Sequence, residues 1–224
     1  MIVESLSEIA TLGARMVPDT DSLRPEAEAL CATARWCYAR GWVPATSGNF
    51  SVRDGGRMLI SPSGLDKGVM TTADLLETDL DGRVIQSNRK PSAETALHLV
   101  IYRDLPEMGA IVHVHSIWNT LLSAHFASDG YVPLTGYELL KGLAGVTTHE
   151  YQARVPIIAN SQDYVDLAAR LAHALEEFDD AHGVLLSAHG LYTWGKSVAE
   201  ARRHLEALEF LFEVEGRRLT GGLG

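Results

Sequence analysis

Five stretches of the chain place apolar residues three and four positions apart, which is the spacing of an amphipathic helix. In the first stretch Asp21 or Ser22 can cap the helix, and Gly41 ends it. The last stretch opens with a capping box, Ser197-Val198-Ala199-Glu200. The pattern predicts helices over residues 21–41, 92–103, 117–127, 163–178 and 197–217.

Other stretches are short, rich in β-prone residues and bounded by turn residues, which is typical of strands. Two pairs of such stretches flank glycine-containing turns, Asp54-Gly55-Gly56-Arg57 and Asp81-Gly82, and therefore predict two hairpins. The predicted strands are residues 46–53 and 58–61, 78–80 and 83–85, 110–115, 155–158 and 184–187. Hairpins interleaved with helices predict one α/β domain over residues 1–224, with helices packed on a sheet that is at least partly antiparallel.

Composition and charge narrow the classes of function. Hydrophobic residues make up 46% of the chain and charged residues 21%, values that exclude a disordered, collagen-like or coiled-coil protein. The net charge of -10 would repel a phosphate backbone, so we expect no nucleic-acid partner. Because a spanning helix needs roughly 20 consecutive apolar residues, which no run here approaches, we expect no membrane segment. The opening Met-Ile-Val-Glu also lacks the basic run and apolar core of a signal peptide.

The two cysteines, Cys31 and Cys37, stand six positions apart in the first predicted helix. With a rise of about 1.5 Å per residue, they would lie roughly 9 Å apart on different faces, too far for a disulfide. We therefore expect two reduced, buried thiols in a cytoplasmic protein.

The segment Ala110-Ile111-Val112-His113-Val114-His115 carries the most chemistry. Side chains alternate between the faces of a strand, so His113 and His115 project to the same side, where they could share a metal ion. The alternative is a half-buried strand whose exposed face carries histidines by chance. His189, which follows the apolar strand at 184–187, offers a third ligand, and three histidines leave an open position as catalytic zinc sites do. The other histidines fit a structural or solvated role better: His98, His125, His149, His173, His182 and His204.

A second cluster is rich in Gly, Ser and Asn. Ser47-Gly48-Asn49 opens one strand of the first hairpin and Ser61-Pro62-Ser63-Gly64 follows the other, so the hairpin should bring both near one another. Their backbone N–H groups and hydroxyls could bind an anion, and Ser92 adds a hydroxyl where a helix begins. The alternative is that these residues serve turn geometry alone.

Two carboxylates are candidates for acid–base chemistry. Glu94 is expected in the first turn of its helix, where the helix dipole favours an acid without any function. Glu138, in Tyr137-Glu138-Leu139-Leu140-Lys141-Gly142, could equally be a solvated residue. Spacing alone does not decide either case.

Taken together, the motifs resemble the class II aldolase/adducin family over about residues 26–217. They are, in order, Ser47-Gly48-Asn49, Ser61-Pro62-Ser63-Gly64, Pro91-Ser92-Ala93-Glu94, His113-Val114-His115 and His189-Gly190. The resemblance implies a three-layer α/β/α domain around a mostly antiparallel sheet, and homotetramers with active sites near subunit boundaries. It also implies one divalent metal per subunit, usually zinc, held by His113, His115 and His189. The residues that it implies for phosphate binding are Gly48, Asn49, Ser63, Gly64 and Ser92.

Within the family, the stretches 45–53, 60–68 and 136–142 are most similar to those of its sugar-phosphate dehydratases. This resemblance implies a lyase of amino-acid biosynthesis in which Glu138 is the acid/base. Glu94 matches the acid that contacts metal or substrate in the related aldolases, whereas Ala93 replaces a serine that helps them to bind phosphate. The aldolases also place a catalytic tyrosine near the C-terminus, and no tyrosine follows Trp194 here.

Two alternatives stay open. An aldolase or 4-epimerase acting on a pentulose or deoxyhexulose phosphate would use the same metal and differ in the bond that breaks. An adducin-like binding module would keep the fold without the chemistry, although such a module has no need of all three histidines.

Overall fold

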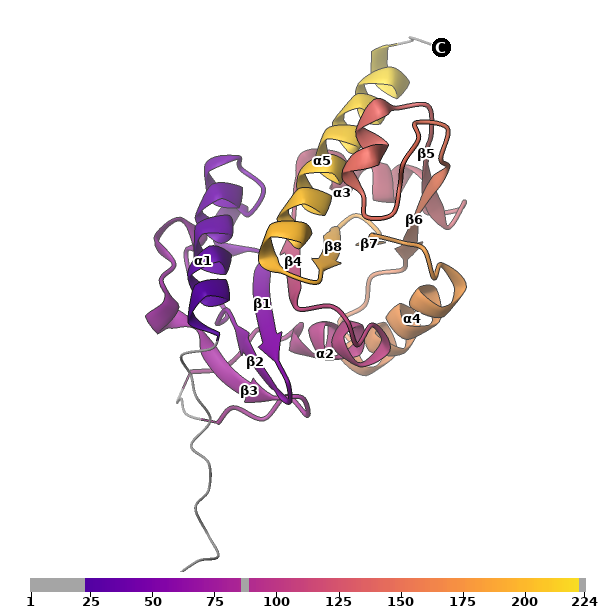
Figure 1. The fold of residues 1–224 in the computed structure, drawn as a ribbon. Helices are drawn as coiled ribbons and strands as arrows, with labels where there is room; N and C mark the ends of the chain where they lie inside the picture. Colours follow the sequence, from indigo (N-terminus) through magenta and orange to yellow (C-terminus); the bar gives the residue numbers. More distant parts are fainter. Residues whose placement is uncertain (1–22, 86–88, 222–224) are drawn as a thin grey trace, which may run out of the picture.

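A computed structural model describes residues 23–85 and 89–221, which form an eight-stranded sheet flanked by helices (Figure 1). The strand order is β3-β2-β1-β4-β8-β7-β6-β5. Every neighbouring pair is antiparallel except β6 and β7, which are parallel. The strands are β1 (Asn49–Asp54), β2 (Arg57–Ile60), β3 (Leu76–Asp79), β4 (Ala110–Val114), β5 (Tyr131–Leu134), β6 (Ala153–Ile158), β7 (Gly183–Leu186) and β8 (Gly190–Gly195).

Helices cover both faces of the sheet, so the predicted three-layer α/β/α architecture is confirmed. One face packs against α1, α3 and α5, and the other packs against α2 and α4. In Figure 1, α5 crosses in front of β4 and β8. The α-helices are α1 (Arg24–Ala39), α2 (Thr95–Asp104), α3 (Ile117–His125), α4 (Tyr164–Glu177) and α5 (Val198–Gly221). Short 3₁₀ helices are η1 (Pro44–Thr46), η2 (Lys67–Val69), η3 (Thr72–Asp74) and η4 (Glu138–Gly142).

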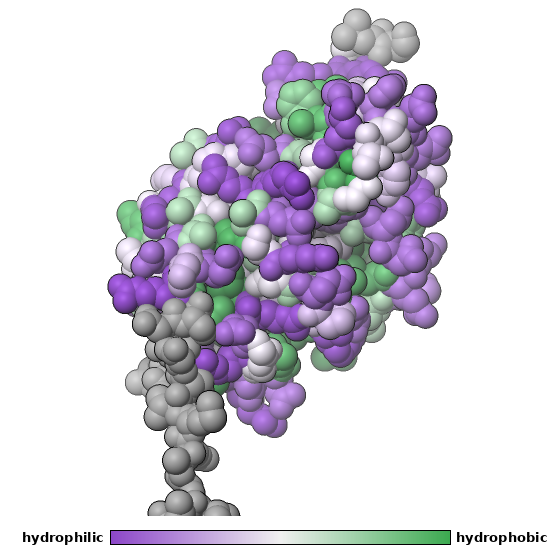
Figure 2. All heavy atoms as spheres, viewed as in Figure 1, coloured by the Kyte–Doolittle hydropathy of each residue, from purple (hydrophilic) through white to green (hydrophobic). Residues whose placement is uncertain are grey.

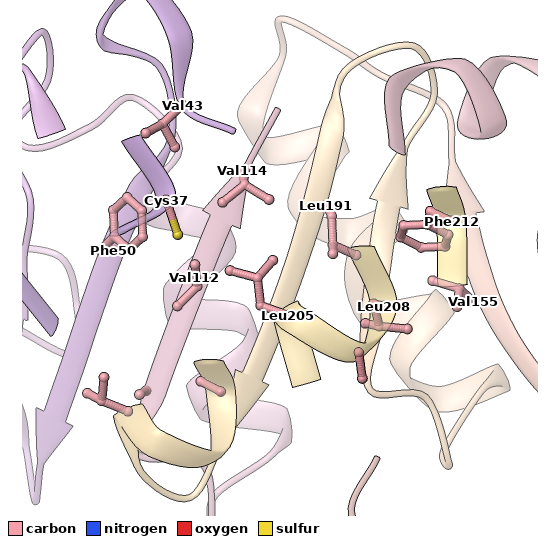
Figure 3. Packing of buried hydrophobic residues seen from close by; sticks show 14 of the residues in the cluster. Cys37, Val43, Phe50, Val112, Val114, Val155, Leu191, Leu205, Leu208 and Phe212 are labelled. Atoms are coloured by element: carbon pink, nitrogen blue, oxygen red, sulfur yellow. The ribbon is translucent and has the colours of Figure 1, made fainter. Parts of the chain in front are cut away.

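Strand β4 lies near the middle of the sheet and is buried on both faces. Its Val112 and Val114 lie in the apolar layer with Cys37, Phe50 and Leu205 (Figure 3). Burying each such side chain contributes roughly 1.5–3 kcal/mol. The outer surface is different: the face in Figure 2 is mostly hydrophilic, with apolar residues in small separate groups. Apolar side chains therefore enclose the central strand on both of its faces.

Two strands were not predicted. β8 is a run of Leu, Tyr, Thr and Trp between Gly190 and Gly195, all buried, and it pairs with both β4 and β7. Its β-prone composition between two glycines could have identified it. β5 contains Pro133, which lacks an N–H to donate, and it lies at the edge of the sheet, where proline is tolerated.

Several predicted boundaries shift. The first helix begins at Arg24. The proposed caps, Asp21 and Ser22, lie outside the described residues, and so does the N-terminal segment, for which we expect no signal peptide. The second hairpin was wrong in extent, since the arm after the turn pairs through a single bridge, Thr78 to Val84. The capping box is half formed: Ser197 Oγ accepts from the Glu200 N–H, but the Glu200 carboxylate accepts from the Lys196 N–H instead.

Both cysteines are buried and free, as predicted. Across residues 23–85 and 89–221, none of the helices combines the length and the apolarity that crossing a bilayer demands.

Candidate metal centre and anion site

A row of polar side chains crosses three adjacent strands on the face that α2 and α4 cover. In the register of the sheet, Asn49 of β1 lies opposite His113 of β4, which lies opposite Tyr192 of β8. Directly opposed residues point to the same face, so the three side chains are neighbours. The rings of His113 and Tyr192 stack with centroids 3.9 Å apart and an angle of 12° between their planes.

The three histidines predicted to share a metal lie together. One ring nitrogen from each of His113, His115 and His189 lies within 4.8 Å of the others. His189 reaches this position from a tight turn between β7 and β8, in which Ala188 adopts a left-handed φ of 54°. The Ala188 N–H donates to Ser123 Oγ at 3.0 Å, which holds the strained turn in place.

The proton on His113 is assigned by its surroundings. Its Nδ1 lies 3.0 Å from the carbonyl oxygen of Leu191 and must donate to it, so a neutral ring presents a lone pair at Nε2. That Nε2 is buried and has no hydrogen-bond partner among the described residues. Burial, followed by the neighbouring histidines, holds the pKa of His113 well below 6.5. Burial likewise lowers the pKa of His115 to about 4, so both rings are neutral near pH 7, the form that binds a metal.

Glu94 faces the same point from the turn that leads into α2, at the N-cap position rather than in the first helical turn that the sequence predicted. Its Oε2 lies 3.3 Å from His113 Nε2, and its Oε1 lies 3.4 Å from His189 Nε2. A lone pair and a carboxylate repel at this distance unless a cation or a proton lies between them. Three imidazoles and one carboxylate are ligands that a divalent cation accepts, so the donor set fits a metal.

Hydrogen bonds from neighbouring strands hold the carboxylate of Glu94 in position. Asn49 Nδ2 and the Tyr192 hydroxyl each donate to Oε2 at 2.7 Å. The orientation of the Asn49 amide is fixed in turn, because its Oδ1 accepts from His98 Nε2. His98 Nδ1 therefore accepts from the Ser51 hydroxyl, at 2.7 Å. Residues that do not touch the centre thus determine its geometry.

The segments of the predicted anion site also lie together. Ser61 joins β1 twice: its N–H donates to the Phe50 carbonyl, and its Oγ accepts from the Phe50 N–H. Asn49 Nδ2 lies 3.3 Å from Ser92 Oγ, which brings the third segment to the first. Gly48 has a left-handed φ of 75°, and a Cβ there would lie 2.7 Å from the His113 carbonyl oxygen. Only glycine fits where this loop approaches β4.

Ser63 and Gly64 continue this arrangement. The N–H of Ser63 lies 3.5 Å from the carbonyl oxygen of Lys90, next to the segment that carries Ser92, and Gly64 has a left-handed φ of 72°. The hairpin and the approach to α2 therefore bring all five candidate phosphate-binding residues to one region. Their roles as ligands stay predictions.

Glu138 is not part of the cluster that the three histidines form. It begins η4 with its side chain 72% exposed, and its carboxylate forms ion pairs with Lys141 and His149. The hydrogen bond from Lys141 lowers its pKa, so the group is ionised near neutral pH. Within a single chain, no ion pair joins this carboxylate to His113, His115 or His189 among the described residues.

Sequence reasoning missed two residues of the site, His98 and Tyr192, and it also missed the burial of Lys67. Recognising β8 as a strand beside β4 would have placed Tyr192 next to His113. His98 was read as structural, and it is indeed buried in a helix, but its bond to Asn49 depends on a tertiary contact. No signal in the sequence indicates that Lys67 is buried.

Comparison with known proteins agrees with this geometry. The family model described as class II aldolase and adducin N-terminal domain matches residues 28–215. The chain is 48% identical over 198 residues to a methylthioribulose-1-phosphate dehydratase of Cronobacter sakazakii, covering 88% of this chain and 97% of that protein. It is 49% identical over 189 residues to the protein of that name from Methylococcus capsulatus, covering 84% and 91%.

Among solved structures, the chain is similar to L-fuculose-1-phosphate aldolase from Thermus thermophilus. The TM-score is 0.71 at 28% identity, covering 91% of this chain and 99% of that one. A second L-fuculose 1-phosphate aldolase gives a TM-score of 0.73 at 25% identity, covering 89% and 88%.

Proposed function

The chain belongs to the class II aldolase and adducin family, and from that premise we propose that it is a methylthioribulose-1-phosphate dehydratase. The reaction removes water from 5-methylthioribulose 1-phosphate and gives 2,3-diketo-5-methylthiopentyl 1-phosphate, a step of methionine salvage. The enzyme is accordingly a lyase. Curated relatives of this name are 45–49% identical over most of the chain, well above the 25–28% of the aldolase structures.

The observation that carries the proposal is the convergence of three imidazoles on one point, with an unpartnered lone pair on His113 Nε2. We assign the cation to zinc, one per chain, because zinc favours three nitrogen ligands plus an open position in catalytic sites. A bound divalent cation polarises a ketone oxygen and stabilises the negative charge that develops on it. His113, His115 and His189 would hold the cation, and Glu94 stands beside it, where it could contact the cation or the substrate.

The chemistry needs one proton carrier. The substrate has a ketone at C2 and hydroxyls at C3 and C4, so removal of the C3 proton and loss of the C4 hydroxyl as water give an enol, which tautomerises to the diketone. Glu138 would take the C3 proton and return a proton to the departing hydroxyl. General acid–base catalysis of this kind is typically worth about 10²–10⁴-fold. No electron transfer is involved.

The exposure of Glu138 supports an assembly in which a second copy completes the site. We propose a homotetramer, as the family resemblance implies, in which Glu138 of one chain faces the histidines of its neighbour. Ile117, Leu121 and Phe210 of α3 and α5 are 74%, 53% and 52% exposed, and apolar surface of this kind is typical of a contact between copies. The buried, reduced cysteines are in keeping with a cytoplasmic location.

The decisive experiment is a product assay on the zinc-loaded protein with methylthioribulose 1-phosphate. We expect formation of the diketone, its loss on chelation and its recovery with added zinc. Metal analysis should give one ion per chain in the wild type, and much less in His113→Ala. His173→Ala, which alters an exposed histidine of α4, is the matched control. Absence of turnover in the metal-loaded protein would refute the proposal.

Glu138→Gln tests the proton carrier. This variant should keep its metal and bind substrate but lose at least about 100-fold in kcat. Glu176→Gln, an exposed acid on α4, should retain full activity. Wild-type turnover in Glu138→Gln would remove Glu138 from the mechanism.

A second candidate is favoured by one observation: two of the similar solved structures are L-fuculose 1-phosphate aldolases. The family resemblance matches Glu94, which lies beside the histidines, to the acid of such aldolases. An aldolase or 4-epimerase would release an aldehyde from, or epimerise, a pentulose or deoxyhexulose phosphate. Incubation with those sugars, with detection of the aldehyde and of the epimer, separates the two activities. A binding module would contain no metal and would not respond to added zinc.

A further inference from the structure

Lys67 is a buried cation that forms no ion pair among the described residues. Its side chain is 1% exposed, and no carboxylate among the described residues lies within ion-pairing distance of it. Its neighbour Asp66 instead accepts from the Gly68 N–H, at 2.8 Å. Burial lowers the pKa of Lys67 to about 8, although the charge of Asp66 acts in the opposite direction. Burying an unpaired ammonium is unfavourable, so an anion beside it would be stabilised.

The ammonium group ties together the two loops of the candidate anion site. Nζ donates to the carbonyl oxygen of Thr46 at 2.9 Å and to that of Leu65 at 2.8 Å. Thr46 directly precedes Ser47-Gly48-Asn49, and Leu65 directly follows Ser63-Gly64. The third N–H of the ammonium has no acceptor in the part of the chain that the structure describes.

The loop on the Thr46 side is held in an unfavourable conformation. Ala45 and Thr46 have left-handed φ angles of 52° and 65°, which non-glycine residues rarely adopt. Strain of this kind persists where surrounding contacts enforce it, and it is concentrated at functional sites. Ser47 Oγ, one residue on, is buried and has no hydrogen-bond partner among the described residues. A hydroxyl without a partner, next to a loop that a cation holds, indicates a missing ligand.

Charge favours the same conclusion. A net charge of -10 and the carboxylate of Glu94 both oppose a phosphate dianion at this site. Lys67 places a positive charge beside the two loops of the anion site, where it offsets these negative charges.

We propose that Lys67 supplies the positive charge of the phosphate subsite and positions the two loops that form it. The inference rests on the proposed function in one respect, namely that the bound phosphate belongs to a sugar phosphate. Binding of the phosphate group to this subsite can be measured without turnover of a sugar phosphate.

The test is calorimetric binding of inorganic phosphate to the zinc-loaded protein. We expect Lys67→Met to raise the Kd for phosphate at least tenfold. Lys67→Gln retains N–H donors for the two carbonyls and removes the charge, so it should fold even if the methionine variant does not, and should also bind phosphate more weakly. Lys196→Met alters an exposed lysine after β8 and should bind like the wild type. Lys90→Met tests the exposed lysine next to Ser92 as the rival source of charge.

Kinetics separate a binding role from a general structural one. With methylthioribulose 1-phosphate, the Lys67 variants should raise KM at least tenfold and change kcat much less. Three results would each overturn the inference: Lys67→Gln binds phosphate as tightly as the wild type, only Lys90→Met binds phosphate more weakly, or the wild type does not bind phosphate. A protein that binds phosphate through Lys67 but does not dehydrate the sugar would leave the inference standing and refute the proposed function.

Discussion

Replacing Glu209 with glutamine should stabilise the protein at neutral and alkaline pH. Glu209 lies on α5, 3% exposed, and its Oε1 accepts from Asn119 Nδ2 at 2.8 Å. Burial raises the pKa of this carboxyl from 4.5 to about 7. Each pH unit of difference between folded and unfolded states corresponds to about 1.36 kcal/mol, so the ionised group destabilises the folded protein by about 3 kcal/mol.

The sign follows from proton binding. Between pH 4.5 and about 7 the unfolded chain has lost the proton of Glu209 while the folded protein retains it, so raising the pH favours unfolding. Above that window both states are ionised and the destabilisation is constant. Glutamine is neutral at every pH and keeps an oxygen that can accept from Asn119, so the variant avoids this loss.

The assay is urea unfolding of the zinc-loaded wild type and Glu209→Gln at equal subunit concentration, from pH 5 to pH 8. The difference in the free energy of unfolding should grow by roughly 1.4 kcal/mol per pH unit up to about pH 7, and then level off. Glu206→Gln, on the same helix and 52% exposed, should differ from the wild type by no more than about 0.5 kcal/mol throughout. A Glu209→Gln protein that is no more stable at pH 8 would show the reasoning to be wrong.

Three further predictions concern backbone strain, the support of Glu94 and the thiols. Gly48→Ala should lower the free energy of unfolding, measured in urea, by about 2–4 kcal/mol, because its Cβ would meet the His113 carbonyl at a left-handed φ. Gly56→Ala, with open space around it, should behave as the wild type. Tyr192→Phe should keep the metal, measured as ions per chain, but lower kcat about tenfold, because it removes a hydrogen bond to a carboxylate; unchanged kcat would contradict this role. At pH 8 the native thiols should react with a chromogenic disulfide at least about 100-fold more slowly than the urea-unfolded thiols. The reason is that burial raises the pKa of Cys31 to about 11 and raises that of Cys37 further. Comparable rates would contradict the burial of the two thiols.

Local patterns in the sequence were enough to predict the helices and most strands. Spacing of apolar residues located the five α-helices of the described residues to within a few positions, and glycine-centred turns located the first hairpin. These signals arise from neighbours in the chain. The strand with His113 and His115 was found for the same reason, since the alternation of its side chains is a property of the strand itself.

Those local patterns could not predict contacts between segments that are distant in the sequence. The role of β8 as a central strand depends on its pairing with β4, about 80 positions away, and Tyr192 becomes part of the site only through that pairing. His98 matters because it fixes the amide of Asn49, and Lys67 because its ammonium reaches two carbonyls in separate loops. Hydrogen bonds of this kind carry no periodicity that a sequence could display.

Residue types and their order were therefore sufficient to indicate an α/β protein with three histidines that could share a metal. Folding decided the rest: that the histidines meet, that a carboxylate faces their lone pairs, and that a lysine is buried without an ion-pair partner in the part of the chain that the structure describes. The physical reason is that burial and electrostatics depend on which groups surround an atom in space, and those groups come from strands and loops far apart in the chain.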